Sequence, residues 1–298
     1  MSPWSVPSAE EVLEGLVAAA LAEDVGPGDW TTEWTVPQEH TSRAVIVAKG
    51  PLVVSGATAV RAIYGALDPE LEVTAEVQDG GGAEPGDILF RLRGATRGIL
   101  TGERAALNFL GRLSGVATLT RLFVEQVQGT AARIVDTRKT TPGWRLLEKA
   151  AVVHGGGANH RLGLHDMVMV KDNHVDAAGG VGEATRRALE GNDRGIPVEV
   201  EVRSLTELQE VLPLGVDRIL LDNMDLETLR EAVSRVGAFA QEARETADGP
   251  WPRPELEASG NVSLGTVRDV AQTGVDLISV GALTHSAPYA DVSLQVQR

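Results

Sequence analysis

The sequence predicts two architectures in one chain: an α+β module with an antiparallel sheet, followed by an α/β domain built on parallel strands. Two observations support this division. Residues 43–92 contain short runs rich in branched side chains and separated by Gly, Pro and Asp turns, as expected of antiparallel strands. From residue 133 onward, apolar strands alternate with helical segments, which is typical of a parallel sheet covered on both faces.

The first module begins with a helix, because residues 10–22 carry apolar side chains at helical spacing. A loop follows at residues 23–32. A capping pattern and regularly spaced leucines predict a long helix at residues 101–128 that links the two parts. Between them, strands are predicted at residues 44–50, 52–56, 71–77 and 87–92, a helix at 59–67 and a turn at 79–87.

The second part repeats strand and helix, and polar or small residues recur at the carboxyl ends of its strands. In α/β barrels that edge carries the active site, because several loops converge there. The pattern alone does not decide whether the sheet closes into a barrel. Strands are predicted at residues 133–136, 167–170, 198–202, 218–221, 255–258 and 276–280, and helices at 146–153, 182–190, 205–212, 225–243 and 264–273.

Composition limits the classes of function. The 298 residues carry a formal net charge of -15, which argues against a general nucleic-acid surface. No apolar run is long enough to span a membrane, and the first residues lack the pattern of a signal peptide. The absence of cysteine excludes disulfides and thiolate chemistry and fits a reducing compartment, so we expect a cytoplasmic protein.

One stretch, residues 133–174, runs against the overall charge, with seven Lys and Arg residues against four acids. A basic region on an acidic protein concentrates small anions. The alternative is a set of solvated helix charges. Arg138, Lys139, Arg161, Lys171 and His160 are donors suited to carboxylates and phosphates.

Two acids at neighbouring strand ends complement these donors. Glu201 and Asp222 offer the hard oxygen ligands that Mg²⁺ uses together with substrate phosphates. Glu201 could instead be a buried acid paired with a lysine, and Asp222 could cap the next helix. Glu199 points to the same face as Glu201 by strand alternation, and Glu201 is preferred because it is nearer the strand end.

A third element lies between a predicted strand and a predicted helix. Ser259, Gly260 and Asn261 could hold a phosphate on backbone N–H groups at a helix start, or could simply cap the helix. The run Gly155–Gly157 lacks the spacing of a dinucleotide fingerprint, and the histidines lack the spacing of a zinc site.

Several segments, in order and spacing, resemble the quinolinate phosphoribosyltransferases, the decarboxylating nicotinate-nucleotide pyrophosphorylases of NAD synthesis. The resemblance extends from about residue 23 to residue 286. Next to the matched motifs, four positions differ from the residues usual in the family: Trp144, Ala150, Val153 and His154. The segments are DTRKTTPGWR, GGGANHRLGLHD, KDNH, EVEV, LLDN, EASGNVSL and GVDLISVGALTHS, with TGERAALNFLGRLSGVAT as a linker helix.

The resemblance implies an N-terminal α/β sandwich with an antiparallel sheet, at residues 1–112, joined to an open α/β barrel at residues 113–284. The C-terminal segment 285–298 would return to the first domain. It also implies a homodimer with shared active sites, Mg²⁺ as cofactor, and a pentosyltransferase reaction. Phosphoribose would pass from phosphoribosyl pyrophosphate to quinolinate with loss of CO₂, giving nicotinate mononucleotide.

The resemblance also implies roles for individual residues. Arg138, His160, Arg161 and Lys171 would bind the carboxylates of quinolinate, with Arg104 supplied by the neighbouring subunit and Thr137 completing the pocket. Lys139, Glu201 and Asp222 would be the catalytic residues, and the two acids would also bind Mg²⁺. Ser259, Gly260, Asn261 and Gly281 would hold the 5′-phosphate.

Two other functions compete with this one. A related phosphoribosyltransferase-like protein, such as the family member found beside molybdate transport genes, need not act on quinolinate. A non-catalytic sensor of the phosphorylated sugar would tolerate loss of Glu201 or Asp222. Both acids are present, as are Arg104, Arg138, Arg161 and Lys171, which favours the enzyme.

Overall fold

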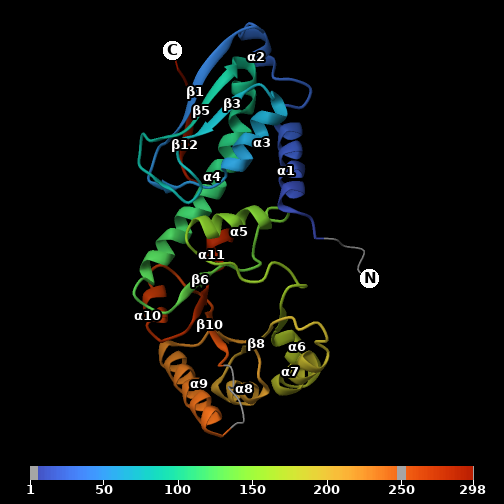
Figure 1. Cartoon of the computed structure of the whole chain (residues 1–298), viewed down its shortest axis with the longest axis vertical. Coiled ribbons are helices and arrows are strands. Elements are labelled where there is room, and N and C mark those ends of the chain that lie inside the picture. The colour runs from blue at the N-terminus through green and yellow to red at the C-terminus, as the bar shows by residue number, and fades with distance from the viewer. Residues whose placement is uncertain (1–5, 247–252, 298) are drawn as a thin grey trace. The chain divides into compact units, whose positions relative to one another are not determined.

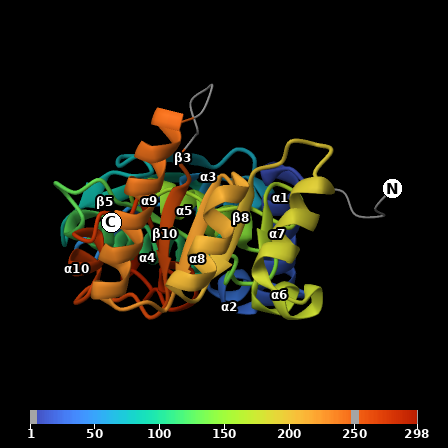
Figure 2. The same ribbon diagram turned by 90° about the horizontal axis from the view of Figure 1, so that it is seen from below.

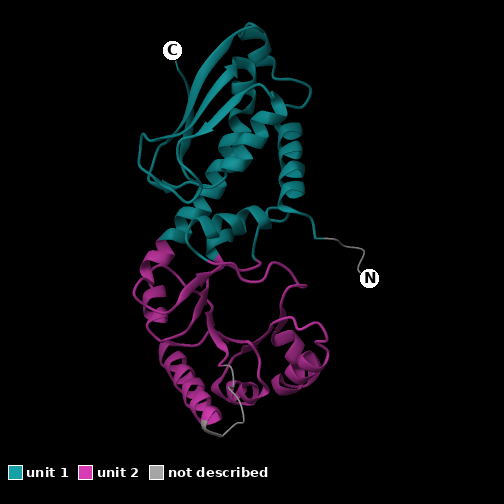
Figure 3. Cartoon of the chain, in the orientation of Figure 1, with its two compact units in different colours: residues 1–121, 139–157, 282–298 teal, residues 122–138, 158–281 magenta. Residues whose placement is uncertain are grey.

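A computed structural model describes residues 6–246 and 253–297, and its chain divides into two compact units (Figure 3). Unit 1 comprises residues 1–121, 139–157 and 282–298, and unit 2 comprises residues 122–138 and 158–281. This grouping differs from the predicted ranges 1–112 and 113–284, chiefly because residues 139–157 belong to unit 1. The predicted boundary itself falls inside the long helix α4 (Thr96–Gln126).

Unit 1 contains a four-stranded antiparallel sheet in the order β12-β1-β5-β3. Its last strand in sequence, β12, pairs with β1, so residues 292–297 lie in the same sheet as the first strand of the chain. The predicted antiparallel sheet is therefore confirmed. The strands are β1 (Thr41–Ala48), β3 (Glu72–Ala75), β5 (Ile88–Ala95) and β12 (Val292–Gln297), with a separate pair formed by β2 (Leu52–Val53) and β4 (Gly82–Ala83).

Helices cover one face of this sheet and enclose the core of unit 1 (Figure 1). The predicted loop at residues 23–32 is wrong at its end, because α2 begins at Trp30. The Asp29 carboxylate accepts the N–H of Thr32 and so caps that helix. The helices are α1 (Ala9–Asp24), α2 (Trp30–Thr35), α3 (Ala57–Leu67), α4, α5 (Arg145–His154) and α11 (Ala282–His285).

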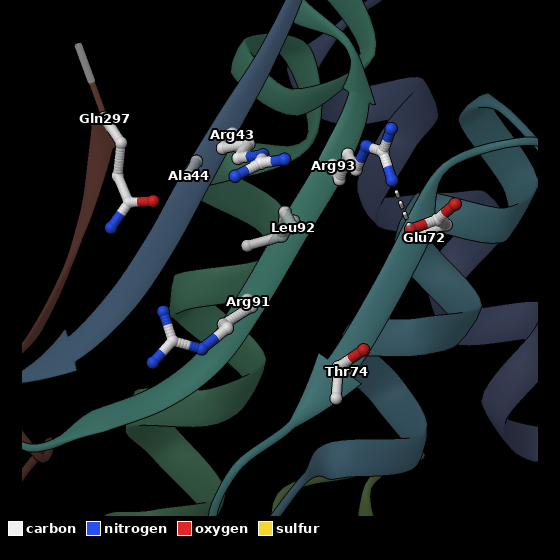
Figure 4. A pocket seen from close by; sticks show the side chains of 8 residues that line it. All are labelled: Arg43, Ala44, Glu72, Thr74, Arg91, Leu92, Arg93 and Gln297. Atoms are coloured by element: carbon white, nitrogen blue, oxygen red, sulfur yellow. Dashed lines mark ion pairs between the residues drawn. The ribbon is translucent and has the colours of Figure 1, made fainter.

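The other face of the sheet is polar (Figure 4). Arg43 of β1 lies directly opposite Arg93 of β5, and Arg91 follows on the same face. Arg91 pairs with Glu76 at 2.8 Å, with both side chains well exposed. An antiparallel sheet with one packed and one solvated face shows this alternation, so the sheet needs a helical layer on one side only.

Arg112 of α4 connects three segments of unit 1 that lie far apart in sequence. Its guanidinium pairs with Glu148 of α5 at 2.6 Å, and the Glu148 side chain is fully buried. It also donates to the backbone carbonyls of Thr284 and Ala287. These contacts explain why α5 and the C-terminal segment belong to the same unit as α4.

Unit 2 contains a six-stranded sheet in the order β6-β11-β10-β9-β8-β7, and every pairing is parallel. The predicted parallel-stranded domain is confirmed. β6 and β7 form the two edges. The strands are β6 (Arg133–Val135), β7 (Val168–Val170), β8 (Val198–Val202), β9 (Arg218–Asp222), β10 (Glu255–Ser259) and β11 (Leu277–Ser279).

Helices follow these strands and pack on the outer face of the curved sheet, where α8 and α9 are visible from two directions (Figures 1 and 2). Among the described residues, no helix is both long enough and apolar enough to cross a bilayer. The helices are α6 (Asp172–Ala178), α7 (Val181–Glu190), α8 (Leu205–Val211), the 3₁₀ turn η1 (Leu212–Leu214), α9 (Leu226–Thr246) and α10 (Val267–Ala271).

Candidate active site

The inner face of the unit 2 sheet carries charged side chains where a buried sheet is normally apolar. In β8, Val198, Val200 and Val202 alternate with Glu199 and Glu201, and all three valines are fully buried. Successive side chains of a strand point to opposite faces, so both glutamates share the face opposite the valines. The helices cover the apolar face, and the charged face is left for a site.

The strand register brings two predicted acids together. Glu201 of β8 lies beside Leu220 of β9, and Asp222 is the second residue after Leu220 on the same face. Asp222 in turn lies beside Ser259, the last residue of β10. The sheet therefore gathers Glu201, Asp222 and Ser259 at adjacent carboxyl ends, as the sequence predicted.

Lys171 joins this edge from the next strand. Its Nζ lies 2.9 Å from Oε2 of Glu201, and the Glu201 side chain is 10% exposed while that of Lys171 is 43% exposed. Glu201 is thus an acid paired with a lysine, and its predicted role as a Mg²⁺ ligand stays a prediction. The pair remains partly open to solvent, so Lys171 can also face a ligand.

Two arginines of unit 2 lie close enough to influence each other. Burial, and then the neighbouring charge of Arg138, lower the pKa of the Arg161 guanidinium. Arg161 is 8% exposed and donates to the carbonyl of Met167 at 3.2 Å. Two guanidinium groups gathered in a partly buried place disfavour each other, and a bound anion relieves that repulsion.

A short turn holds the loop that follows Arg161. The backbone N–H groups of Leu162 and Gly163 donate to the carboxylate of Asp166 at 2.6 and 2.8 Å. Burial would raise the pKa of Asp166, but these hydrogen bonds outweigh it and lower the pKa. Asp166 therefore stays ionised and fixes the loop between Arg161 and β7.

His160 lies inside the unit 2 sheet, between two glutamates. Its Nε2 is 2.9 Å from Oε2 of Glu199 and 3.3 Å from Oε2 of Glu257, and both glutamate side chains are almost fully buried. Its Nδ1 accepts the backbone N–H of Arg161 at 2.7 Å. Both ring nitrogens are thus engaged within the protein, so the predicted direct contact with a substrate carboxylate stays a prediction.

The glutamates also set the protonation of His160. Burial alone would lower the pKa of His160, but contacts with Glu199 and Glu257 raise it to about 9. The pKa of Glu199 is raised as well, by burial and by Glu257. Nδ1 accepts the N–H of Arg161 and so is not the place for an additional proton. We therefore assign the proton that is lost near pH 9 to the cluster of His160, Glu199 and Glu257 as a whole.

This cluster predicts a loss of stability in mild alkali. The folded-state pKa of His160, about 9, lies above its ordinary value of 6.5, so the folded protein holds a proton that the unfolded chain releases between these values. The stabilisation, at most on the order of 3 kcal/mol, is complete below about pH 6.5 and disappears as the pH rises through 9.

Urea unfolding from pH 6.5 to 9.5 measures this loss. Unfolding free energies that stay constant over this range would contradict the assignment.

The loop after β10 approaches the loop after β9 very closely. A Cβ on Gly260, which has φ +107°, would lie 2.1 Å from Oδ1 of Asn223, so only glycine fits there. Asn223 and Asn261 also adopt positive φ values, 53° and 49°. The tight backbone leaves Gly260 and Asn261 exposed at the same edge of the sheet as Asp222.

The predicted helix start next to Ser259–Asn261 is wrong. Helix α10 begins only at Val267. Ser263 and Thr266 form a turn first, since the backbone N–H of Ser263 donates to Oγ1 of Thr266 and the N–H of Thr266 donates to the carbonyl of Ser263. An anion bound by Gly260 and Asn261 would therefore meet loop N–H groups and not a helix N-terminus.

The remaining predicted residues divide between the units. Thr137 and Gly281 are half-buried and follow β6 and β11 of unit 2. Arg104 and Lys139 belong to unit 1. Arg104 is exposed on α4, and the carbonyl of Lys139 accepts a hydrogen bond from Oγ1 of Thr284. All the other predicted site residues belong to unit 2.

The sequence interpretation missed three residues of the site, of which two, Glu257 and Asp136, are buried. Glu257 contacts His160, Arg218 lies 3.5 Å from Glu257, and Oδ1 of Asp136 accepts the backbone N–H of His160 at 2.9 Å. A signal was present for Glu257, because the strand ELEAS repeats the alternation of acidic and apolar residues seen in VEVEV. Nothing in the sequence indicated that Arg218 of the neighbouring strand would lie beside it.

Comparison with known proteins agrees with this architecture. Family models of quinolinate phosphoribosyl transferase match residues 29–114 as the N-terminal domain and residues 116–295 as the C-terminal domain. Quinolinate phosphoribosyltransferase (decarboxylating) 2a, mitochondrial, of Nicotiana tabacum is 41% identical over 303 residues, which cover 95% of this chain and 82% of the relative. A probable nicotinate-nucleotide pyrophosphorylase (carboxylating) of Synechocystis is 40% identical over 298 residues, which cover 100% of this chain and 95% of the relative.

Solved structures give the same result. The nicotinate-nucleotide pyrophosphorylase of Francisella tularensis superimposes with a TM-score of 0.88 at 36% identity, over 98% of each chain. This likeness confirms the predicted fold class, an N-terminal domain with an antiparallel sheet followed by an α/β barrel-like domain. The chain belongs to the quinolinate phosphoribosyltransferase family.

Proposed function

We propose that this protein transfers phosphoribose from phosphoribosyl pyrophosphate to quinolinate, with decarboxylation, and so forms nicotinate mononucleotide, pyrophosphate and CO₂. The observation that carries the proposal is a cationic group and an acidic edge within one unit of the family's fold. Arg138, Arg161 and Lys171 are the cations, and Glu201 and Asp222 form the edge. A dicarboxylate and a metal-bound pyrophosphate need these two kinds of partner.

The cations would bind quinolinate. Arg138 and Arg161 can each donate two parallel N–H bonds to a planar carboxylate, which fixes both the position and the plane of the pyridine ring. Lys171 would add a point charge while it keeps its contact with Glu201. Thr137 would close the pocket beside Arg138, and Lys139 would contact the phosphoribosyl pyrophosphate.

The acids are suited to hold Mg²⁺. Oε2 of Glu201 accepts from Lys171, and Oδ2 of Asp222 accepts from Asn223. The second oxygen of each carboxylate receives no hydrogen bond from the described residues, so each acid keeps one hard ligand. Mg²⁺ bound there would neutralise charge on the departing pyrophosphate.

The chain's own residues would supply positioning and fixed charge rather than covalent catalysis. The pyridine nitrogen attacks C1 of the ribose as the bond to pyrophosphate breaks, and the positive charge that develops at C1 lies near Glu201 and Asp222. The bond from C2 to its carboxylate then breaks and releases CO₂. The electron pair stays on C2, stabilised by the adjacent cationic nitrogen, until C2 takes a proton. Gly260, Asn261, Ser259 and Gly281 would hold the 5′-phosphate.

We further propose that the working enzyme is a homodimer in the cytoplasm, in which Arg104 of a second copy completes the quinolinate site. Arg104 is exposed on α4 and makes no hydrogen bond or ion pair with the described residues of its own chain. A guanidinium exposed in this way is available to a ligand bound by another subunit.

Mixing two inactive variants tests the shared site. Arg104→Ala and Arg138→Ala should each lose most activity, and co-refolded mixtures should regain up to about a quarter of wild-type activity. The gain arises because one of the two sites in a mixed dimer then has both arginines, and random assembly makes about half of the dimers mixed. Mixtures as inactive as either parent would contradict sharing.

Product analysis separates the proposed enzyme from its alternatives. Protein incubated with quinolinate, phosphoribosyl pyrophosphate and Mg²⁺ should form nicotinate mononucleotide. Consumption of free nicotinate without CO₂ release would indicate a different phosphoribosyltransferase. Binding of the sugar phosphate without turnover would indicate a sensor.

A further inference from the structure

We propose that Glu199 and Glu257 are positioning residues for quinolinate: they fix the ring of His160, and through it the backbone of Arg161. The inference rests on the proposed function, since it concerns how the dicarboxylate site is held. Neither glutamate would touch the substrate. Their role follows from four observations about the interior of unit 2.

The two glutamates hold the His160 ring from two strands. Glu199 comes from β8 and Glu257 from β10, and their side chains are 0% and 1% exposed. Nε2 of His160 lies within 3.3 Å of both carboxylates. A ring held between two buried carboxylates cannot rotate without moving Nε2 and its proton away from both, which is costly in a low-dielectric interior.

The other ring nitrogen transmits this constraint. Nδ1 accepts the backbone N–H of Arg161 at 2.7 Å, and the backbone N–H of His160 donates to Asp136 at 2.9 Å. With Nδ1 as acceptor, the ring proton lies on Nε2, which faces the two carboxylates at 2.9 and 3.3 Å. The carboxylates thus select the tautomer that holds the backbone of Arg161.

Arg161 is the residue that depends on this arrangement. Its guanidinium donates to the carbonyl of Met167 and lies near Arg138. Two like charges close together separate unless the backbone beneath them is fixed. A shift of the Arg161 backbone would move its guanidinium away from the substrate carboxylate, and such misplacement can cost up to about 100-fold in activity.

The same three side chains could be taken for a metal site, because their ligand atoms lie within 4.8 Å of one another. Two contacts argue against a metal. Nε2 carries the proton when Nδ1 accepts the N–H of Arg161, so it has no lone pair for a cation. Arg218 also lies 3.5 Å from Glu257 and already supplies a positive charge there.

Glu257→Gln and Glu199→Gln test the proposal, with Glu255→Gln as a matched control. Glu255 lies on the same strand as Glu257 but is 40% exposed and contacts Arg133 and Arg218. Each buried variant should raise the KM for quinolinate roughly 10-fold, with the KM for phosphoribosyl pyrophosphate and kcat within about threefold of wild type. Glu255→Gln should leave all three near wild type.

Several results would overturn the positioning role. An unchanged KM for quinolinate would do so, and so would an equal rise in both KM values, because a general loss of structure affects both substrates. If the glutamine variants fail to fold, ¹⁵N NMR of the wild-type protein decides: a His160 ring with a bare Nδ1 and a protonated Nε2 supports the proposal, and a protonated Nδ1 refutes it. A wild-type protein with no transferase activity would instead refute the proposed function.

Discussion

Replacing Arg138 with alanine is expected to weaken quinolinate binding by about 100-fold or more and to leave phosphoribosyl pyrophosphate binding nearly unchanged. The loss is large because a partly buried carboxylate of the ligand would then face only the guanidinium of Arg161 and no longer that of Arg138. Truncating one partner of a buried, hydrogen-bonded charge pair costs about 2–5 kcal/mol. Calorimetric titration of each substrate separately measures both affinities.

Arg133→Ala is the matched control. Arg133 lies on β6, five positions before Arg138 in the sequence, and its side chain is 59% exposed and paired with Glu255. Its removal should change neither affinity, since exposed ion pairs contribute little. Wild-type affinity for quinolinate in Arg138→Ala would mean that the dicarboxylate binds elsewhere.

Replacing Asp222 with asparagine should lower kcat/KM for phosphoribosyl pyrophosphate by about 100-fold, a typical effect of removing one fixed charge at a developing transition state. The change keeps the shape of the side chain and its hydrogen bond to Asn223 can be re-formed, but the negative charge is lost. Higher Mg²⁺ should recover part of the activity, because weaker binding of the proposed Mg²⁺ would account for part of the loss. Initial rates at several Mg²⁺ concentrations give this dependence.

Asp225→Asn is the control for this variant. Asp225 accepts the backbone N–H of Thr228 at the start of α9, three residues after Asp222. Asparagine caps helices about as well as aspartate, so stability and kcat should both stay near wild type. An Asp222→Asn enzyme with the kinetics of Asp225→Asn would remove Asp222 from the catalytic residues.

The strand ends were predictable from sequence because two independent patterns coincide there. Alternation placed Glu199 and Glu201 on one face, and parallel strands place their carboxyl ends along one edge. Glu201, Asp222 and Ser259 therefore meet as predicted. Lys171 belongs to this set because its strand, β7, lies next to β8.

The surroundings of His160 were not predictable in the same way. The sequence places His160 in a loop among cations, which favours a ligand-binding role. Its ring instead lies between Glu199 and Glu257, and this depends on the order of strands across the sheet, which the local pattern does not contain. The start of helix α10 was not predictable either. Hydrogen bonds between Ser263 and Thr266 form a turn, so the helix begins only at Val267.

The extent of unit 1 was also not predictable from the local sequence pattern. The helical pattern of residues 146–153 was clear, but its assignment to unit 1 depends on the ion pair between Arg112 and Glu148. These residues are 36 positions apart in sequence. A contact over this distance leaves no periodic signal, so the boundaries of compact units are harder to predict than their elements.

Release of labelled CO₂ tests the central claim most directly. Quinolinate labelled with ¹³C in the carboxylate at C2 should, with phosphoribosyl pyrophosphate and Mg²⁺, give one labelled CO₂ for each nicotinate mononucleotide formed. Quinolinate labelled in the carboxylate at C3 should give unlabelled CO₂ and a labelled nucleotide. Nucleotide formed without CO₂, or label released from C3, would contradict the proposed reaction.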